Sequence, residues 1–275
     1  MTRWLPGIGR GDAPVRLFAF PHAGGGSRFF LPWHAALGPG VQVCPVVLPG
    51  RESRTREEPY TRIGPLVADL AGALGPYLDR PFAFFGHSLG ALVAFETVRA
   101  LAAAGLRAPG LLIASGRRAP HLTPRSTTLH LLPRERFLDH MIALNGTPVH
   151  TDRRRRLLEH FLPMVRADYE LNETYEPGPG PPPACPVAAY HGSEDPVATV
   201  PQVRAWRDAT TGPFRLRLFP GDHFYHRDAP AGVIAAIRAD LAEAGLTTGS
   251  PDGTPPVHVG VGHGGPPGQD RRPDQ

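Results

Sequence analysis

The sequence predicts an α/β fold in which a mostly parallel sheet is covered by helices on both faces. Short apolar segments recur along the chain and end at glycine or proline, and stretches with helical spacing follow several of them. Strands buried on both faces read as continuous apolar runs, and parallel neighbours need a crossover connection that is usually a helix. The alternation of the two patterns is therefore typical of a parallel sheet.

The first half of the chain supplies three predicted strands. The apolar run 15–20 (VRLFAF) stops at a proline and opens into the glycine-rich turn HAGGGS, and a second run, 41–50, ends at Pro-Gly. Residues 63–78 carry apolar side chains at helical spacing, although their glycines weaken a helix. The third strand, 81–88, leads directly into a strong helix over 89–105 that ends at a glycine.

The second half supplies three more strands. Apolar runs predict them over 108–116, 185–192 and 214–221. A helix is expected between the last two strands, at 201–209, and another after the last strand, at 230–244. Strand and helix thus alternate again towards the end of the chain.

The alternation breaks between residues 117 and 180. This stretch has no good strand, several helical patterns and a final EPGPGPPPA segment. It predicts an all-helical insertion within a single domain that covers residues 1–246. The remaining residues, 247–275, are rich in glycine, proline and polar side chains, so this tail is expected to be disordered.

Composition narrows the class of protein. The net charge is +4, and all 29 lysine-plus-arginine positions are arginine, which we attribute mainly to a GC-rich genome. A mildly basic surface suits an acidic partner, but the scattered cationic residues do not favour nucleic-acid binding. Cys44 and Cys185 are expected to be buried free thiols. With no continuous apolar run of membrane or signal-peptide type, the protein is expected to be cytoplasmic. A monomer is also expected.

A nucleophile motif stands where the third strand meets its helix. Residues 86–90 read G-H-S-L-G, a G-x-S-x-G pattern between a predicted strand and a predicted helix. In this context the serine occupies a strained turn, with its hydroxyl exposed at the top of the sheet above a helix N-terminus. Ser88 is therefore the predicted nucleophile of an acyl-transfer reaction.

Such a serine needs a base and an orienting carboxylate, which follow it along the chain in this topology. His223 comes directly after the last strand, and Asp195 comes directly after the preceding one. Both positions lie at carboxyl ends of strands, the edge on which Ser88 also lies. We therefore predict a Ser88–His223–Asp195 triad.

Other histidines and carboxylates were weighed against this assignment. His87, His191 and His226 are near in sequence, but each departs from the expected position at a strand end. Glu194 is one residue out of phase with the acid, and Asp222 adjoins the base without room to turn back to it. The loop after the fourth strand, a further acid position in related folds, reads GRRAP and holds no carboxylate.

Acyl transfer also needs donors for the oxyanion of the tetrahedral intermediate. The backbone N–H groups of Leu89, after the nucleophile, and Ala23, in the HAGGGS turn, are the predicted pair. The three glycines of this turn do not match a phosphate-binding spacing, which argues against a nucleotide site.

Together, several blocks resemble one group of α/β-hydrolases. FAFPHAGGG, LPGRESRTREEP, FFGHSLGALVAFE, RADYELNETYEP and HGSEDPV…FPGDHFYH are similar to the type II, editing thioesterases of polyketide and nonribosomal peptide synthetases, in the same order over about residues 15–245. The resemblance implies hydrolysis of thioesters on the phosphopantetheine arm of acyl or peptidyl carrier proteins, without a cofactor or metal of the enzyme's own. It also implies that the insertion is a lid, and it places the same triad.

Substrate contacts are predicted at His22, Arg51, Phe137, Met141 and Met164. The methionines and phenylalanine suit a chamber that tolerates varied short acyl chains, although about half of the apolar insertion residues are expected to be its core. For Arg51 two interpretations stay open, one at the entrance for the arm and one in an ion pair that fixes a loop.

Three rival functions are weaker. A stand-alone medium-chain fatty-acyl thioesterase or general esterase would have the same triad. A chain-terminating type I thioesterase is disfavoured because no carrier domain is attached. A catalytically silent docking module is disfavoured because all three predicted triad members are present.

Overall fold

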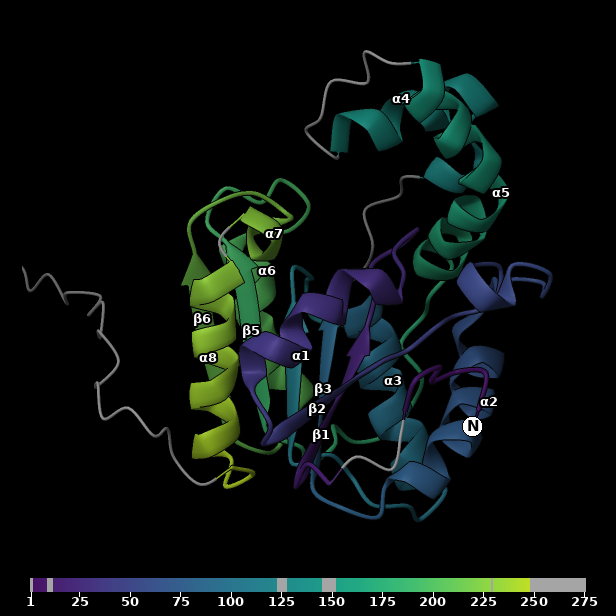
Figure 1. Ribbon diagram of the computed structural model, residues 1–275. Helices are drawn as coiled ribbons and strands as arrows, with labels where there is room; N and C mark the ends of the chain where they lie inside the picture. The colour runs from purple at the N-terminus through teal and green to yellow at the C-terminus, as the bar shows by residue number, and fades with distance from the viewer. Residues whose placement is uncertain (1, 9–11, 123–127, 145–151, 229, 248–275) are drawn as a thin grey trace, which may run out of the picture.

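Six parallel strands form one sheet in the order β2-β1-β3-β4-β5-β6 (Figure 1). The computed structural model describes residues 2–8, 12–122, 128–144, 152–228 and 230–247, without the side chains of 152–158 and 228. The strands are β1 (Val15–Phe20), β2 (Val41–Pro45), β3 (Phe82–His87), β4 (Leu111–Ser115), β5 (Val187–Gly192) and β6 (Phe214–Phe219). The predicted α/β fold is confirmed.

Helices cover both faces of the sheet (Figure 1). One face carries α1 (Leu31–Leu37) and α8 (Pro230–Glu243), and the other carries α2 (Ile63–Leu74), α3 (Leu89–Ala103) and α6 (Val200–Arg204). Because side chains alternate along a strand, Phe18 and Phe20 of β1 pack with α2 and α3, while Leu17 and Ala19 pack with α1 and α8. Every residue of β1 is buried, which explains its continuous apolar run.

Two local predictions needed correction. The second strand ends at Pro45 and not at residue 50. The Val46 N–H still donates to the Ala19 carbonyl oxygen, and after this bond the chain leaves the sheet. Helix α1 was not predicted at all. Its seven residues span only two turns between glycine-rich segments, too few for a helical period to be visible.

The stretch 117–180 holds helices and, among its described residues, no strand. Helix α4 (Arg134–Leu144) and helix α5 (Asp152–Glu173) stand beyond the carboxyl ends of the strands (Figure 1). We call this stretch the helical insertion. Pro163 lies near the middle of α5, where a proline removes one backbone hydrogen bond, and we call the residues that follow it the second half of the helix.

The remaining predictions concern the C-terminal tail, membrane helices and the two cysteines. The predicted disordered tail, 247–275, lies outside the described residues beyond residue 247. None of the described helices combines the length and apolar character that crossing a membrane requires. Cys44 and Cys185 are buried and free, as expected.

Candidate active site

Ser88 lies at a strained corner between β3 and α3. Its backbone adopts φ 54° and ψ −115°, a conformation that costs free energy in a residue with a side chain. Its N–H donates to the carbonyl oxygen of Ser115 at 2.8 Å, which ties the corner to the end of β4. The turn leaves the serine half-buried on the wall of a cavity.

The glycines that flank this serine are required by close backbone contacts. A Cβ atom added at Gly86 would lie 2.2 Å from the carbonyl oxygen of Gly90. One added at Gly90 would lie 2.1 Å from the carbonyl oxygen of Phe20, at the end of β1. Only glycine lets the start of α3 approach the sheet this closely, and this approach places Ser88 at the sheet edge.

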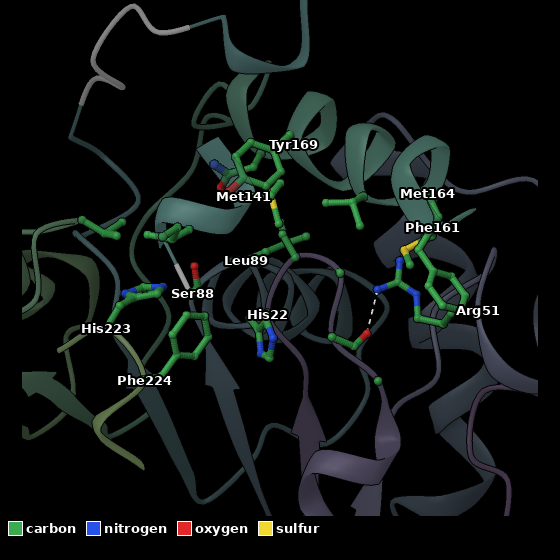
Figure 2. A pocket seen from close by; sticks show the side chains of 18 of the residues that line it. His22, Arg51, Ser88, Leu89, Met141, Phe161, Met164, Tyr169, His223 and Phe224 are labelled. Carbon is green, nitrogen blue, oxygen red and sulfur yellow. Dashed lines mark hydrogen bonds between the residues drawn. The ribbon is translucent and has the colours of Figure 1, made fainter. Parts of the chain in front are cut away.

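The loops after β5 and β6 bring Asp195 and His223 together. The imidazole Nδ1 of His223 lies 2.8 Å from Asp195 Oδ2, and both side chains are buried. The second carboxylate oxygen, Oδ1, accepts the N–H of Val197 at 2.8 Å, which fixes the orientation of the acid. His223 and Ser88 line the same cavity, and Figure 2 shows the ring beside the serine.

The alternative carboxylates are engaged elsewhere or exposed. Glu194 is exposed to solvent, whereas its neighbour Asp195 is buried. Asp222 Oδ1 accepts the N–H of Phe224 at 2.6 Å in a local turn. Glycine at position 116 follows β4, and a Cβ atom there would lie 3.3 Å from the His223 ring.

The alternative histidines lie behind the cavity wall. His87 Nδ1 is 2.9 Å from Ser115 Oγ, which is 2.6 Å from the hydroxyl of Tyr225. His226 is buried with its ring 4.0 Å from that of His87, and neither of its nitrogens has a hydrogen-bond partner among the described residues. His191 is buried too, 3.5 Å from Asp195 Oδ2. None of the three lines the cavity, unlike His223.

Burial keeps several of these rings neutral. Burial, followed by the charges of His223 and Arg51, lowers the pKa of His22 to about 4. The pKa values of His87 and His226 also lie well below the usual value, chiefly because of burial and secondarily because neighbouring imidazoles disfavour added positive charge. These three rings therefore carry little imidazolium charge at neutral pH.

Two unengaged backbone N–H groups border the cavity. Within the described residues, neither Ala23 nor Leu89 donates its N–H to another group of the chain, and both residues line the cavity. Leu89 is the first residue of α3, so the partial positive charge of the helix N-terminus adds to its donor strength. Such a pair is what an oxyanion site requires.

The cavity between sheet edge and insertion measures about 1550 Å³. Of the predicted substrate contacts, His22, Arg51, Met141 and Met164 line it (Figure 2). Phe137 is absent from its lining and packs in the core of the insertion, with its ring edge-on to Tyr169 at 5.1 Å. We therefore place Phe137 in the packing of the insertion. The described residues contain no cluster of metal ligands.

The contacts of Arg51 distinguish between its two interpretations, an entrance for the arm and a loop-fixing ion pair. Its guanidinium is buried, donates to the Gly25 carbonyl at 2.9 Å and pairs with Asp168 at 2.6 Å. Figure 2 shows it turned towards the glycine-rich loop. This arrangement is that of a loop-fixing ion pair on the cavity wall. Asp168 was not singled out from the sequence, because its partner is 117 residues away along the chain.

Comparison with known proteins places the chain in a family. The Thioesterase domain family matches residues 15–241. The gramicidin S biosynthesis protein GrsT from Aneurinibacillus migulanus is 37% identical over 213 residues, which cover 78% of this chain and 83% of GrsT.

Two solved structures agree with this placement. The type II thioesterase BorB from the borrelidin biosynthetic cluster superposes with a TM-score of 0.78 at 37% identity, over 86% of this chain and 94% of BorB. YbtT, a type II thioesterase from the yersiniabactin NRPS/PKS biosynthetic pathway, gives a TM-score of 0.75 at 33% identity, over 86% and 96%. The chain belongs to the thioesterase family of α/β-hydrolases and is a type II thioesterase of the kind found in nonribosomal peptide and polyketide clusters.

Proposed function

We propose that this thioesterase removes stalled or aberrant acyl groups from the phosphopantetheine arm of acyl or peptidyl carrier proteins. The observation that carries the proposal is an open cavity of about 1550 Å³ with Ser88 and His223 on its wall. A cavity of this size has room for an acyl group together with the end of the arm that delivers it. The type II thioesterases to which the chain is similar support the same substrate class.

The proposed reaction has two half-reactions through an acyl-enzyme. Ser88 Oγ attacks the thioester carbonyl while its proton passes to Nε2 of His223, whose Nδ1–H donates to Asp195. The carbon–sulfur bond then breaks, and the protonated imidazole returns its proton to the departing thiolate. In the second half-reaction, water loses a proton to His223 and attacks the acyl carbon. The bond to Ser88 Oγ then breaks, and His223 returns the proton to that oxygen as the free acid leaves.

Backbone donors would stabilise both tetrahedral intermediates. The N–H groups of Ala23 and Leu89 border the cavity with no partner elsewhere in the described chain, so they are available to the oxyanion. Because a thiol leaves more readily than an amine, leaving-group protonation is the lesser demand. Admission and choice of the acyl group therefore carry more of the specificity.

The helical insertion would act as the roof of the acyl chamber. His22 on the floor and Met141 and Met164 on the roof are the proposed acyl contacts, and the flexible thioethers adapt to varied chains. Leu31 and Val197, which line the cavity yet stay 63% and 40% exposed, offer an apolar rim for the incoming arm. A monomeric state, a cytoplasmic location and a domain end near residue 246 stay predictions.

Intact-mass spectrometry of loaded carrier protein tests the proposal. Carrier protein bearing acetyl, propionyl or a longer acyl group is incubated with the wild type, Ser88→Ala or Asp195→Asn. We expect loss of the acyl mass with the wild type, no loss above background with Ser88→Ala, and a rate lower by about 10³ to 10⁴ with Asp195→Asn.

The same experiment separates the rival enzyme. If acyl groups stay on the carrier while a free acyl-coenzyme A or simple ester is cleaved in a Ser88-dependent way, the protein is a general thioesterase or esterase, and the editing role is wrong. Circular dichroism of each variant shows whether a lost activity reflects lost folding.

A further inference from the structure

The loop that carries Ala23 is held from two distant parts of the chain. We call residues 22–27, between β1 and the following helical turn, the oxyanion loop. Its glycines leave it few side-chain contacts of its own, so neighbouring residues must fix its shape. These contacts come from Arg51 and Glu52, which follow β2, and from Val165 and Asp168, which follow Pro163 in α5.

A buried ion pair holds two of the peptide units that follow Ala23, the Ala23–Gly24 unit and the Gly25–Gly26 unit. Asp168 Oδ2 accepts the N–H of Gly24 at 2.7 Å, and Arg51 donates to the carbonyl oxygen of Gly25 at 2.9 Å. The carboxylate and guanidinium join each other at 2.6 Å, with only 3% and 4% of their side chains exposed. One donor and one acceptor of the loop are thereby fixed against a single rigid unit.

Helix α5 also packs directly on the loop. Gly24 has φ +74°, and a Cβ atom there would lie 3.0 Å from the Val165 side chain. On the other side, a Cβ atom at Gly50 would lie 3.1 Å from Met164. Helix α5 therefore contacts the oxyanion loop through Val165 and the 50–52 turn through the adjacent Met164.

The pairing of charges suits a site where negative charge develops. An unpaired carboxylate behind the oxyanion loop would repel the oxyanion, and an unpaired buried guanidinium would be costly. The Arg51–Asp168 pair fixes geometry with no net charge. Glu52 adds a further tie, because its carboxylate accepts the N–H of Ser27 at 2.8 Å at the far end of the loop.

We propose that Asp168 and Arg51 are positioning residues that aim the Ala23 N–H at the oxyanion, so that oxyanion stabilisation depends on the docking of the second half of α5. The insertion is then part of the catalytic apparatus as well as a cover for the acyl chain. This inference rests on the role proposed for Ala23. Loss of one oxyanion donor typically lowers kcat by 10² to 10³, which sets the upper limit of the effect.

The test compares two ion pairs made by the same helix. Asp168→Asn removes the charge of the carboxylate that accepts the Gly24 N–H. Arg51→Lys shortens the cationic side chain that donates to the Gly25 carbonyl oxygen. The matched control is Glu170→Gln, because Glu170 joins α5 to Arg62 at 2.8 Å without a contact to the oxyanion loop. Each variant is assayed on an acyl N-acetylcysteamine thioester and titrated with an alkylboronic acid, whose tetrahedral adduct on Ser88 mimics the oxyanion.

For Asp168→Asn and Arg51→Lys we expect kcat to fall about 10- to 100-fold with KM changed less than threefold, and boronate affinity to fall by a similar factor. Glu170→Gln should change each quantity less than twofold. The double variant should be no worse than the poorer single variant, because both act on one loop. Equal losses in Glu170→Gln, or a loss of kcat without a loss of boronate affinity, overturn the proposal.

These readouts are independent of the carrier. Should the wild type ignore loaded carrier protein yet cleave the small thioester, the proposed function fails while the positioning test stands. Should Asp168→Asn fail to fold, Arg51→Lys, which keeps the buried charge, decides the result alone.

Discussion

The floor and the roof of the cavity are built on different principles. On the floor, Ser88 and the loops after β5 and β6 are placed by backbone contacts, with glycines where a Cβ atom would lie as close as 2.1 Å to a carbonyl oxygen. On the roof, α4 and α5 present flexible side chains such as Met141, Phe161 and Met164. The floor therefore has one geometry, whereas the roof tolerates change in side-chain size. Acyl preference should depend on the roof side chains, whereas the rate should depend on the floor and on the α5 residues tied to the oxyanion loop.

The strongest way to break the floor is to add a single methyl group. Gly90→Ala places a Cβ atom 2.1 Å from the Phe20 carbonyl oxygen, so the backbone at the corner must shift. We expect a loss of at least about 3 kcal/mol in the free energy of unfolding, together with loss of activity. Urea denaturation and the rate on a small thioester measure both effects.

The matched control for that variant is Gly72→Ala. Gly72 is exposed within α2 and has no atom within 4 Å of an added Cβ. Replacing a helical glycine with alanine should stabilise the protein by about 0.5–1 kcal/mol and leave activity unchanged. A Gly90→Ala protein as stable and active as this control would show that the corner is not fixed by the backbone.

The pH dependence of stability tests the buried histidines that pack behind the floor. The pKa of His226 is lowered well below the ordinary 6.5 by burial, and then by unfavourable electrostatic interactions with His22, His223 and Arg227. Between the two pKa values the unfolded chain binds a proton that the folded chain does not. Stability is thus fully present above pH 6.5 and falls as the pH drops, by up to about 1.4 kcal/mol per pH unit for each such histidine.

His226→Phe should remove one of these contributions. The ring contacts Phe29 at 4.7 Å between centroids and has no hydrogen bond among the described residues to lose, so an aromatic replacement fits the site chemically. Urea melts between pH 7.5 and 5.0 should show a shallower decline for the variant than for the wild type. Parallel curves would mean that His226 does not stay neutral in the folded protein.

The smallest expected effect is on the roof. Met141→Trp should lower kcat/KM for a decanoyl thioester about 10-fold and for an acetyl thioester less than twofold, because the larger ring takes up chamber volume. Phe137→Leu, four residues earlier and absent from the cavity lining, should reduce stability without changing the chain-length profile. A chain-length shift in Phe137→Leu would place that side chain in the chamber after all.

The floor was more accessible to sequence reasoning than the roof, for physical reasons. Strand ends and the G-x-S-x-G corner place Ser88, Asp195 and His223 on one edge of any parallel sheet with these connections. The insertion offers no such reference. Phe137 and Met141 lie one turn apart on α4, and only the packed structure distinguishes the residue in the helical core from the one that faces the cavity.

The ion pair behind the oxyanion loop could not be predicted from the sequence, for a different reason. Arg51 and Asp168 belong to blocks that resemble family motifs, but no spacing rule joins residues that far apart. Their contact depends on how α5 docks against the sheet edge, which is a property of tertiary packing.

Pro163 lies between α4 and the part of α5 that reaches the oxyanion loop. The half of α5 that follows it carries Asp168, which is tied to the oxyanion loop, together with Met164 of the chamber wall, whereas α4, before it, contributes Met141 to that wall. The residues tied to the oxyanion loop are thus constrained by the reaction itself, whereas Met141 is constrained only by the acyl group that it contacts. Such an enzyme can therefore change its acyl preference through α4 while the α5 residues that hold the oxyanion loop stay the same.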